Sequence, residues 1–186
     1  MAVTLGSRPE HGFDEPLGLL SDCHRRIERF LGILETVVAR AAGQPLNDEQ
    51  RRAVEAALEY FRTAAPQHTA DEEESLFPLL RASNSPGAAA ALRTVQTLED
   101  EHAAANVAHA DVEFWYRRWI EFGPLAAPQT EKLSRTLHDL REMYRRHIDV
   151  EDHEIFPLAA ELLDPKHLAH VGQQMARRRG LLRDAG

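Results

Sequence analysis

Apolar residues recur every three or four positions along most of the chain, and this spacing predicts amphipathic helices. The pattern is clearest toward the C-terminus, where the apolar positions are Leu133, Leu137, Leu140, Tyr144, Ile155, Leu158 and Leu162. No stretch alternates apolar and polar residues between turn signals, as a half-buried strand would. We therefore predict an all-α fold.

Helix-breaking residues divide the chain into four long helical segments and a shorter fifth. Asn47, with Gln50 three residues later, has the sequence of a capping box and starts the second segment. Ser85-Pro86 starts the third, because a capping residue precedes a proline at the first helical position. The expected helices cover residues 14–42, 47–81, 85–122, 128–163 and 164–180.

Short connections between the long segments make consecutive helices antiparallel neighbours. We therefore expect an up-down-up-down four-helix bundle over residues 14–163, followed by a short fifth C-terminal helix over residues 164–180. Pro66 and Pro78 lie inside the second segment, where each lacks a backbone donor and favours a kink. The whole chain, residues 1–186, is expected to form a single domain.

Six polar residues occupy positions in the apolar stripes where hydrophobic residues are expected. Each long helix supplies one or two of them: His24, His68, Glu72, His102, His147 and Glu151. One histidine on an apolar stripe is usually a core residue with a hydrogen-bond partner. Six such groups from four helices need one another or a cation, because burying an unpaired carboxylate is very costly.

The same residues belong to an internal repeat. The pattern His-x-x-x-Glu, followed after three further residues by an apolar residue and Phe-Pro, occurs over residues 68–78 and again over residues 147–157. A single histidine precedes each copy at a similar distance: His24 lies 44 residues before His68, and His102 lies 45 residues before His147. His-x-x-x-Glu places both side chains on one helix face, one turn apart. The repeat therefore indicates a site shared between two helical hairpins.

Four histidines and two glutamates offer mixed nitrogen and oxygen ligands. This combination suits iron, manganese or zinc, whereas an all-carboxylate set would suit magnesium or calcium. Because carboxylates can bridge, six protein ligands can hold two metal ions and still leave coordination positions open. Dioxygen, peroxide or nitric oxide could bind at those positions.

At these residues the sequence resembles the hemerythrin-like, HHE cation-binding family, over about residues 17–163. The resemblance implies a four-helix bundle with a non-haem di-iron site, in which two carboxylates bridge the metals and histidines cap them. It implies binding or turnover of dioxygen, peroxide or nitric oxide, with peroxidase, catalase-like or ferroxidase activity as an open question. A non-catalytic sensor or metal store is the alternative, and a purely structural helical interaction module is a third. The implied ligands are His24, His68, Glu72, His102, His147 and Glu151.

Two positions depart from the oxygen-carrying hemerythrins. Those proteins have a second histidine one turn after the third-helix ligand, where this chain has Asn106. They also space the final histidine and carboxylate more widely, which would select Asp152 here, although the internal repeat favours Glu151. The missing histidine should leave the centre more open, so peroxide turnover, iron oxidation or sensing is expected rather than oxygen transport.

Several other polar residues lie near the expected ligands in the sequence. Glu28, one turn after His24, and Tyr144, three residues before His147, are further candidates for the site. His109 lies two turns from His102, too far to share its metal, and is expected to be a core or channel histidine. The remaining acidic residues of the first motif are expected to form a solvated face: Asp71, Glu73 and Glu74.

Composition narrows the choice of partners. The net charge is −8, from 30 acidic and 22 basic residues, which argues against nucleic acid or an anionic membrane as the partner. The single cysteine, Cys23, excludes an internal disulfide and suits a reducing compartment. With no signal peptide and no run of about 18 apolar residues, we expect a cytoplasmic protein whose partner is a small molecule.

Overall fold

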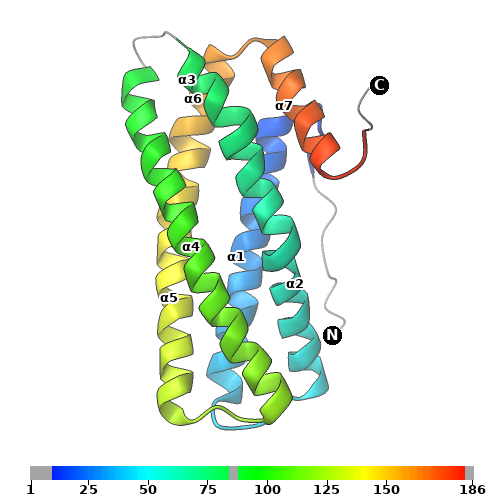
Figure 1. Ribbon diagram of the computed structural model, residues 1–186, viewed down its shortest axis with the longest axis vertical. Coiled ribbons are helices and arrows are strands. Elements are labelled where there is room, and N and C mark those ends of the chain that lie inside the picture. Colours follow the sequence, from blue (N-terminus) through cyan, green and yellow to red (C-terminus); the bar gives the residue numbers. More distant parts are fainter. Residues whose placement is uncertain (1–9, 84–87, 183–186) are drawn as a thin grey trace.

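A computed structural model describes residues 10–83 and 88–182, and throughout these residues the regular structure is helical (Figure 1). Four long helices form the bundle, and a shorter one lies beside it. The long helices are α1 (Pro16–Ala41), α2 (Asp48–Asp71), α4 (Ala88–Phe122) and α5 (Ala127–Val150), and the shorter one is α7 (Pro165–Arg178). The all-α prediction and the expected fifth helix are confirmed.

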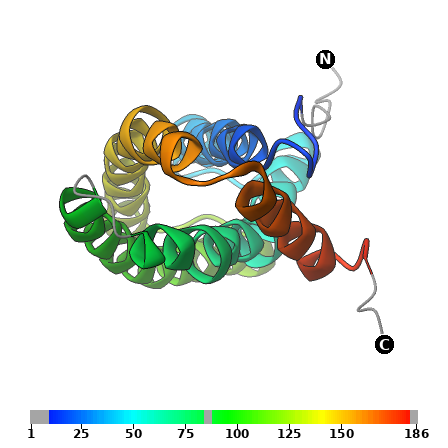
Figure 2. The same cartoon turned by 90° about the horizontal axis from the view of Figure 1, so that it is seen from above.

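Viewed along the bundle, the four long helices surround a common interior, with α1 between α2 and α5 and with α4 on the opposite side (Figure 2). Sequential helices run antiparallel, as the short connections predicted. No helix in the described part of the chain is long and apolar enough to cross a membrane.

Local sequence explains where the helices begin. Asn47 Oδ1 accepts a hydrogen bond from the Gln50 backbone amide at 2.8 Å, and Gln50 Oε1 accepts one from the Asn47 amide at 3.0 Å. These two bonds are the predicted capping box. Asp164 likewise caps α7 by accepting from the His167 amide at 2.8 Å. The predicted start at Ser85-Pro86 falls outside the described residues, and α4 is described from Ala88.

The second and fourth expected helices are each interrupted by one turn of π-helix. The π-turns are η1 (Glu72–Leu76) and η2 (Glu151–Ile155), and they lead into the short helices α3 (Phe77–Ala82) and α6 (Phe156–Leu162). In η1 the Phe77 amide donates to the Glu72 carbonyl five residues back, and Pro78 follows in the first turn of α3. Pro78 therefore lies just after a change of helical register, whereas α2 continues through Pro66.

Both π-turns occupy the same place in the internal repeat. Phe156 donates to the Glu151 carbonyl as Phe77 does to that of Glu72. A proline cannot donate a backbone hydrogen bond, so a change of register just before it sacrifices no additional donor. π-Turns of this kind are rare and often lie at functional sites. Each begins at the glutamate of a repeated motif, so the repeat extends to the backbone.

The apolar interior forms two clusters along the bundle axis. The larger contains side chains of α1, α2, α4 and α5, among them Leu31, Val54 and Leu137. The smaller contains Leu20 and Phe77, together with buried side chains of α6 and α7. The six polar residues of the apolar stripes belong to neither cluster and are almost completely buried. They are therefore withdrawn from water, which strengthens electrostatic interactions among them.

Helix α7 packs across the ends of α1 and α2 (Figure 1). Its Val171 and Met175 side chains are buried. At Gly172 the helix backbone approaches the N-terminal segment so closely that a Cβ there would lie 1.8 Å from the Phe13 carbonyl oxygen. Asp71, fully buried at the end of α2, forms ion pairs with Arg178 and Arg179. The expectation that Asp71 belongs to a solvated face is wrong, because α7 covers it.

Candidate metal centre

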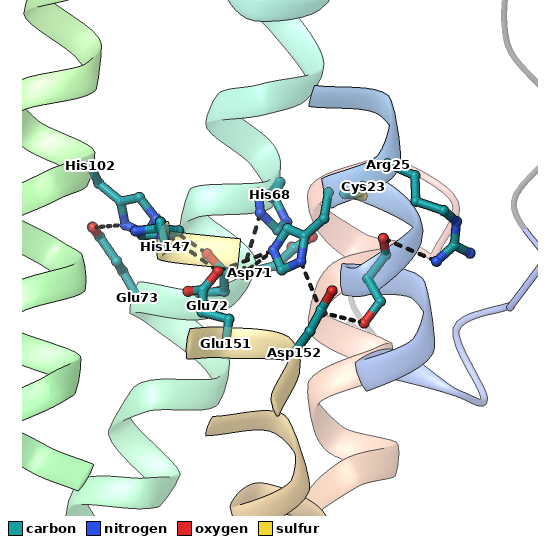
Figure 3. A network of polar contacts seen from close by, with 12 residues as sticks. Cys23, Arg25, His68, Asp71, Glu72, Glu73, His102, His147, Glu151 and Asp152 are labelled. Atoms are coloured by element: carbon teal, nitrogen blue, oxygen red, sulfur yellow. Dashed lines mark hydrogen bonds and ion pairs between the residues drawn. The ribbon is translucent and has the colours of Figure 1, made fainter. Parts of the chain in front are cut away.

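The structure brings all six predicted ligands together inside the bundle. Figure 3 labels five of them: His68, Glu72, His102, His147 and Glu151. Each long helix contributes, and the two glutamates are the first residues of the π-turns. The exposed fractions are 1% for His24, 3% for His68, 0% for Glu72, 6% for His102, 3% for His147 and 0% for Glu151. The side chains form two groups that are each compact enough to hold a metal ion.

The first group joins α1 and α2 to the two π-turns. It consists of His24, His68, Glu72 and Glu151. His24 Nε2 lies 3.1 Å from Glu151 Oε2 and 3.7 Å from Glu72 Oε1. His68 Nε2 lies 3.3 Å from the same Glu72 oxygen. Four ligand atoms therefore face one another in a volume the size of a single ion with its coordination shell.

The second group joins α4 and α5 to η2. It consists of His102, His147 and Glu151. The Nε2 atoms of His102 and His147 lie 3.0 Å apart, and His147 Nε2 lies 3.2 Å from Glu151 Oε2. Two nitrogens bound about 2.1 Å from one ion at a right angle would be about 3 Å apart. The spacing of the two imidazoles thus fits ligation of a common cation.

The two glutamates lie between the groups. Glu72 Oε1 faces His68, and its other oxygen, Oε2, lies 3.5 Å from His102 Nε2. Glu151 Oε2 lies within 3.2 Å of both His24 and His147. Each carboxylate therefore faces histidines of both groups, which is the arrangement that bridging carboxylates require.

Three further carboxylates hold the outer nitrogens of the histidines. Asp152 Oδ1 lies 3.0 Å from His24 Nδ1, Glu73 Oε1 lies 2.9 Å from His102 Nδ1, and Glu101 Oε2 lies 2.8 Å from His147 Nδ1. A carboxylate on one ring nitrogen fixes the ring orientation and makes the other nitrogen a better ligand. In these three rings the nitrogen left for a metal is Nε2, which faces the interior.

The contacts of these three carboxylates with the histidines were not predicted from the sequence. Glu73 was expected on a solvated face, but it reaches across to α4 and contacts His102. Asp152 was weighed as a replacement for Glu151, and it instead holds His24 from outside. A sequence signal does exist, because each of the three carboxylates is adjacent in the chain to a candidate ligand, at positions 73, 101 and 152.

The other candidates lie away from the two groups. Glu28 is exposed and belongs to neither group. Tyr144 is buried, and its ring centroid lies 6.2 Å from that of His147. Its hydroxyl forms a 3.1 Å hydrogen bond with His109 Nε2. Tyr144 therefore packs beside the second group without joining it.

Charge at the centre is poorly balanced by the protein alone. Burial and the neighbouring charge of Glu151 raise the pKa of Glu72 to about 8. Burial opposes a charge on His147, yet its hydrogen bond to Glu151 and the charges of both glutamates raise its pKa to about 9. The carboxylate oxygens of both glutamates are buried without a hydrogen-bond partner, and so is the inner nitrogen of His24. Buried polar atoms of this kind require a partner, and the donor set fits a metal cation.

Comparison with known proteins agrees with this geometry. Residues 15–159 match the sequence profile of the hemerythrin HHE cation binding domain, a segment that contains all six candidate ligands. A protein of Haemophilus influenzae, described as "Uncharacterized protein", is 29% identical over 173 residues, which cover 90% of this chain and 91% of that protein.

Proposed function

The chain belongs to the hemerythrin HHE cation-binding domain family, and we propose that it holds two iron ions at the centre of the bundle and binds or turns over a small oxygen- or nitrogen-containing molecule there. His24 and His68 would hold one ion, and His102 and His147 the other. Glu72 and Glu151 would be shared between them.

The position of the two glutamates carries this proposal. Each carboxylate faces histidines of both groups, and all four carboxylate oxygens lack a hydrogen-bond donor. A single-ion site would not need two buried carboxylates facing both pairs of histidines. Two cations would neutralise the buried charge that otherwise raises the pKa of Glu72.

Nitrogen and carboxylate ligands together suit iron, and manganese or zinc can use the same donors. When bound, a pair of iron ions supplies redox chemistry and open coordination positions for dioxygen, peroxide or nitric oxide. The protein itself contributes ligand geometry through the outer carboxylates and an apolar interior on both sides of the site. That interior would limit access of water to ions held there.

Peroxide consumption by the iron-loaded protein tests the functional part of the proposal. Disproportionation, in which two peroxide molecules give two waters and one dioxygen, needs no other reductant. We expect loss of peroxide with matching release of dioxygen, and no loss with the metal-free protein. A visible absorption band that responds to dioxygen or nitric oxide without peroxide loss would favour the sensor alternative. Zinc as the only metal that binds would contradict the redox function.

A further inference from the structure

A centre buried inside the bundle needs a route by which its small ligand arrives. None of the six candidate ligands is more than 6% exposed. The route must therefore pass between helices, and it should contain a space that leads from the surface toward the ligands. This inference rests on the proposed function, because it concerns access to the same site.

A cavity of about 160 Å³ lies between α2 and α4. Leu58, Phe61 and Arg62 line it from α2, and Asn106, His109 and Val112 line it from α4. Asn106 is exposed and lies one turn after His102, which is about 6 Å along the helix axis. The cavity thus begins at the surface beside the helix that carries a candidate ligand.

His109 forms part of the cavity wall and points toward α5. Its ring stacks on Phe61, with centroids 4.2 Å apart, and its Nε2 atom is hydrogen-bonded to the Tyr144 hydroxyl at 3.1 Å. Tyr144 in turn packs beside His147. A continuous series of contacts therefore runs from the cavity through His109 and Tyr144 to the second ligand group.

The chemistry along this path favours an uncharged molecule. Leu58 and Val112 are almost fully buried, and Phe61 adds an aromatic face. Burial lowers the pKa of His109 to about 4, so its imidazole is neutral at pH 7. The charged side chains at the cavity, Arg62 and Glu113, are already engaged in ion pairs with other residues. Transfer of an ion from water into such surroundings costs much free energy, whereas transfer of a small neutral molecule costs little.

We propose that this cavity is the route by which a small uncharged molecule enters the bundle, and that the hydrogen bond between His109 and Tyr144 closes its inner end. On this proposal, breaking that bond frees the Tyr144 side chain, which packs between His109 and His147, to turn aside and let the molecule pass from the cavity toward His147. The two residues are positioning residues, because they control passage and do not contact the reacting molecule once it is bound.

Dissolved dioxygen, a paramagnetic probe, tests the route without any metal. Under dioxygen pressure we expect faster nuclear relaxation of the Leu58 and Val112 methyl groups and the Tyr144 ring than of Leu31 and Leu34, which are equally buried but lie away from the cavity. His109→Trp should remove the effect at Tyr144. Relaxation at Leu58 and Val112 no greater than at Leu31 would overturn the proposal.

Nitric oxide binding to the iron-loaded, reduced protein tests the gate. We expect His109→Trp to slow association about tenfold, because the larger indole fills the cavity, and Tyr144→Phe to accelerate it, because only the hydrogen bond is lost. Metal content should be unchanged in both variants. Ser134→Trp is the control, because Ser134 lines a larger cavity between α1 and α5. Unchanged rates in both gate variants at full metal content would overturn the gate. Failure of the wild-type protein to bind iron would contradict the proposed function, and the dioxygen measurement would still decide the route.

Discussion

Asp152 holds the outer nitrogen of His24 at 3.0 Å, while the preceding residue, Glu151, lies 3.1 Å from the inner nitrogen of the same ring. Two consecutive acidic residues therefore contact opposite edges of one imidazole. Ser21 adds a hydrogen bond of 2.7 Å to the Asp152 carboxylate and fixes its position. The two acidic residues between which the sequence leaves a choice thus lie on opposite sides of His24, with Glu151 toward the bundle interior.

Replacing Asp152 should weaken metal binding without removing a ligand. Asp152→Asn keeps the size of the side chain but loses the charge that makes the His24 ring more basic. We expect metal affinity to fall about 10- to 100-fold, measured by competition with a chelator. Glu154→Gln, an exposed acidic residue of the same π-turn, is the control and should leave affinity unchanged. Equal effects of the two substitutions would show that Asp152 has no special role.

The Asp71 carboxylate is expected to be important for stability. It is fully buried and forms ion pairs with Arg178, the last residue of α7, and with Arg179, which follows it. Because Asp71→Ala leaves two partly buried arginines without this partner, we expect the free energy of unfolding to fall by about 3–5 kcal/mol, measured in urea. Glu74→Ala removes an exposed contact to Arg178 and should cost less than about 1 kcal/mol. A similar small loss for both variants would contradict the structural role assigned to Asp71.

His109 should make stability depend on pH. Burial lowers its pKa to about 4, below the value near 6.5 of an unfolded histidine. Between these two values the unfolded chain binds more protons than the folded one, so the free energy of unfolding rises with pH. His109→Gln should reduce the rise of the unfolding free energy between about pH 4 and 6.5 by up to about 3 kcal/mol. Identical slopes in urea unfolding of the two proteins would show that His109 titrates normally.

The helices and the convergence of the six side chains could be predicted from the sequence because both follow from helical periodicity. His68 and Glu72 lie one turn apart on the same apolar stripe as Leu58 and Leu76. Once the stripe faces a common interior, the polar residues on it must meet. The internal repeat further indicated that two similar helical hairpins share the site. The starts at Asn47 and Asp164 were predictable because their caps use residues within one turn.

The surroundings of the site were not predictable from local pattern. Glu73 contacts a histidine 29 residues away on another helix, and Asp71 is buried by arginines more than 100 residues away. Both acidic residues flank Glu72 in the sequence, but that position does not tell which of them contacts a histidine and which contacts arginines. The π-turns were also missed, because a change of register by one residue leaves the spacing of apolar residues nearly unaltered.

The number of metal ions bound by defined variants tests the central claim most directly. Elemental analysis of the iron-loaded wild-type protein should give about two ions per chain. His102→Ala disrupts only the second group and should leave about one, whereas Glu151→Ala removes a carboxylate that both groups share and should leave less than one. One ion in the wild-type protein, or equal metal content in all three proteins, would contradict a pair of ions that share the two glutamates.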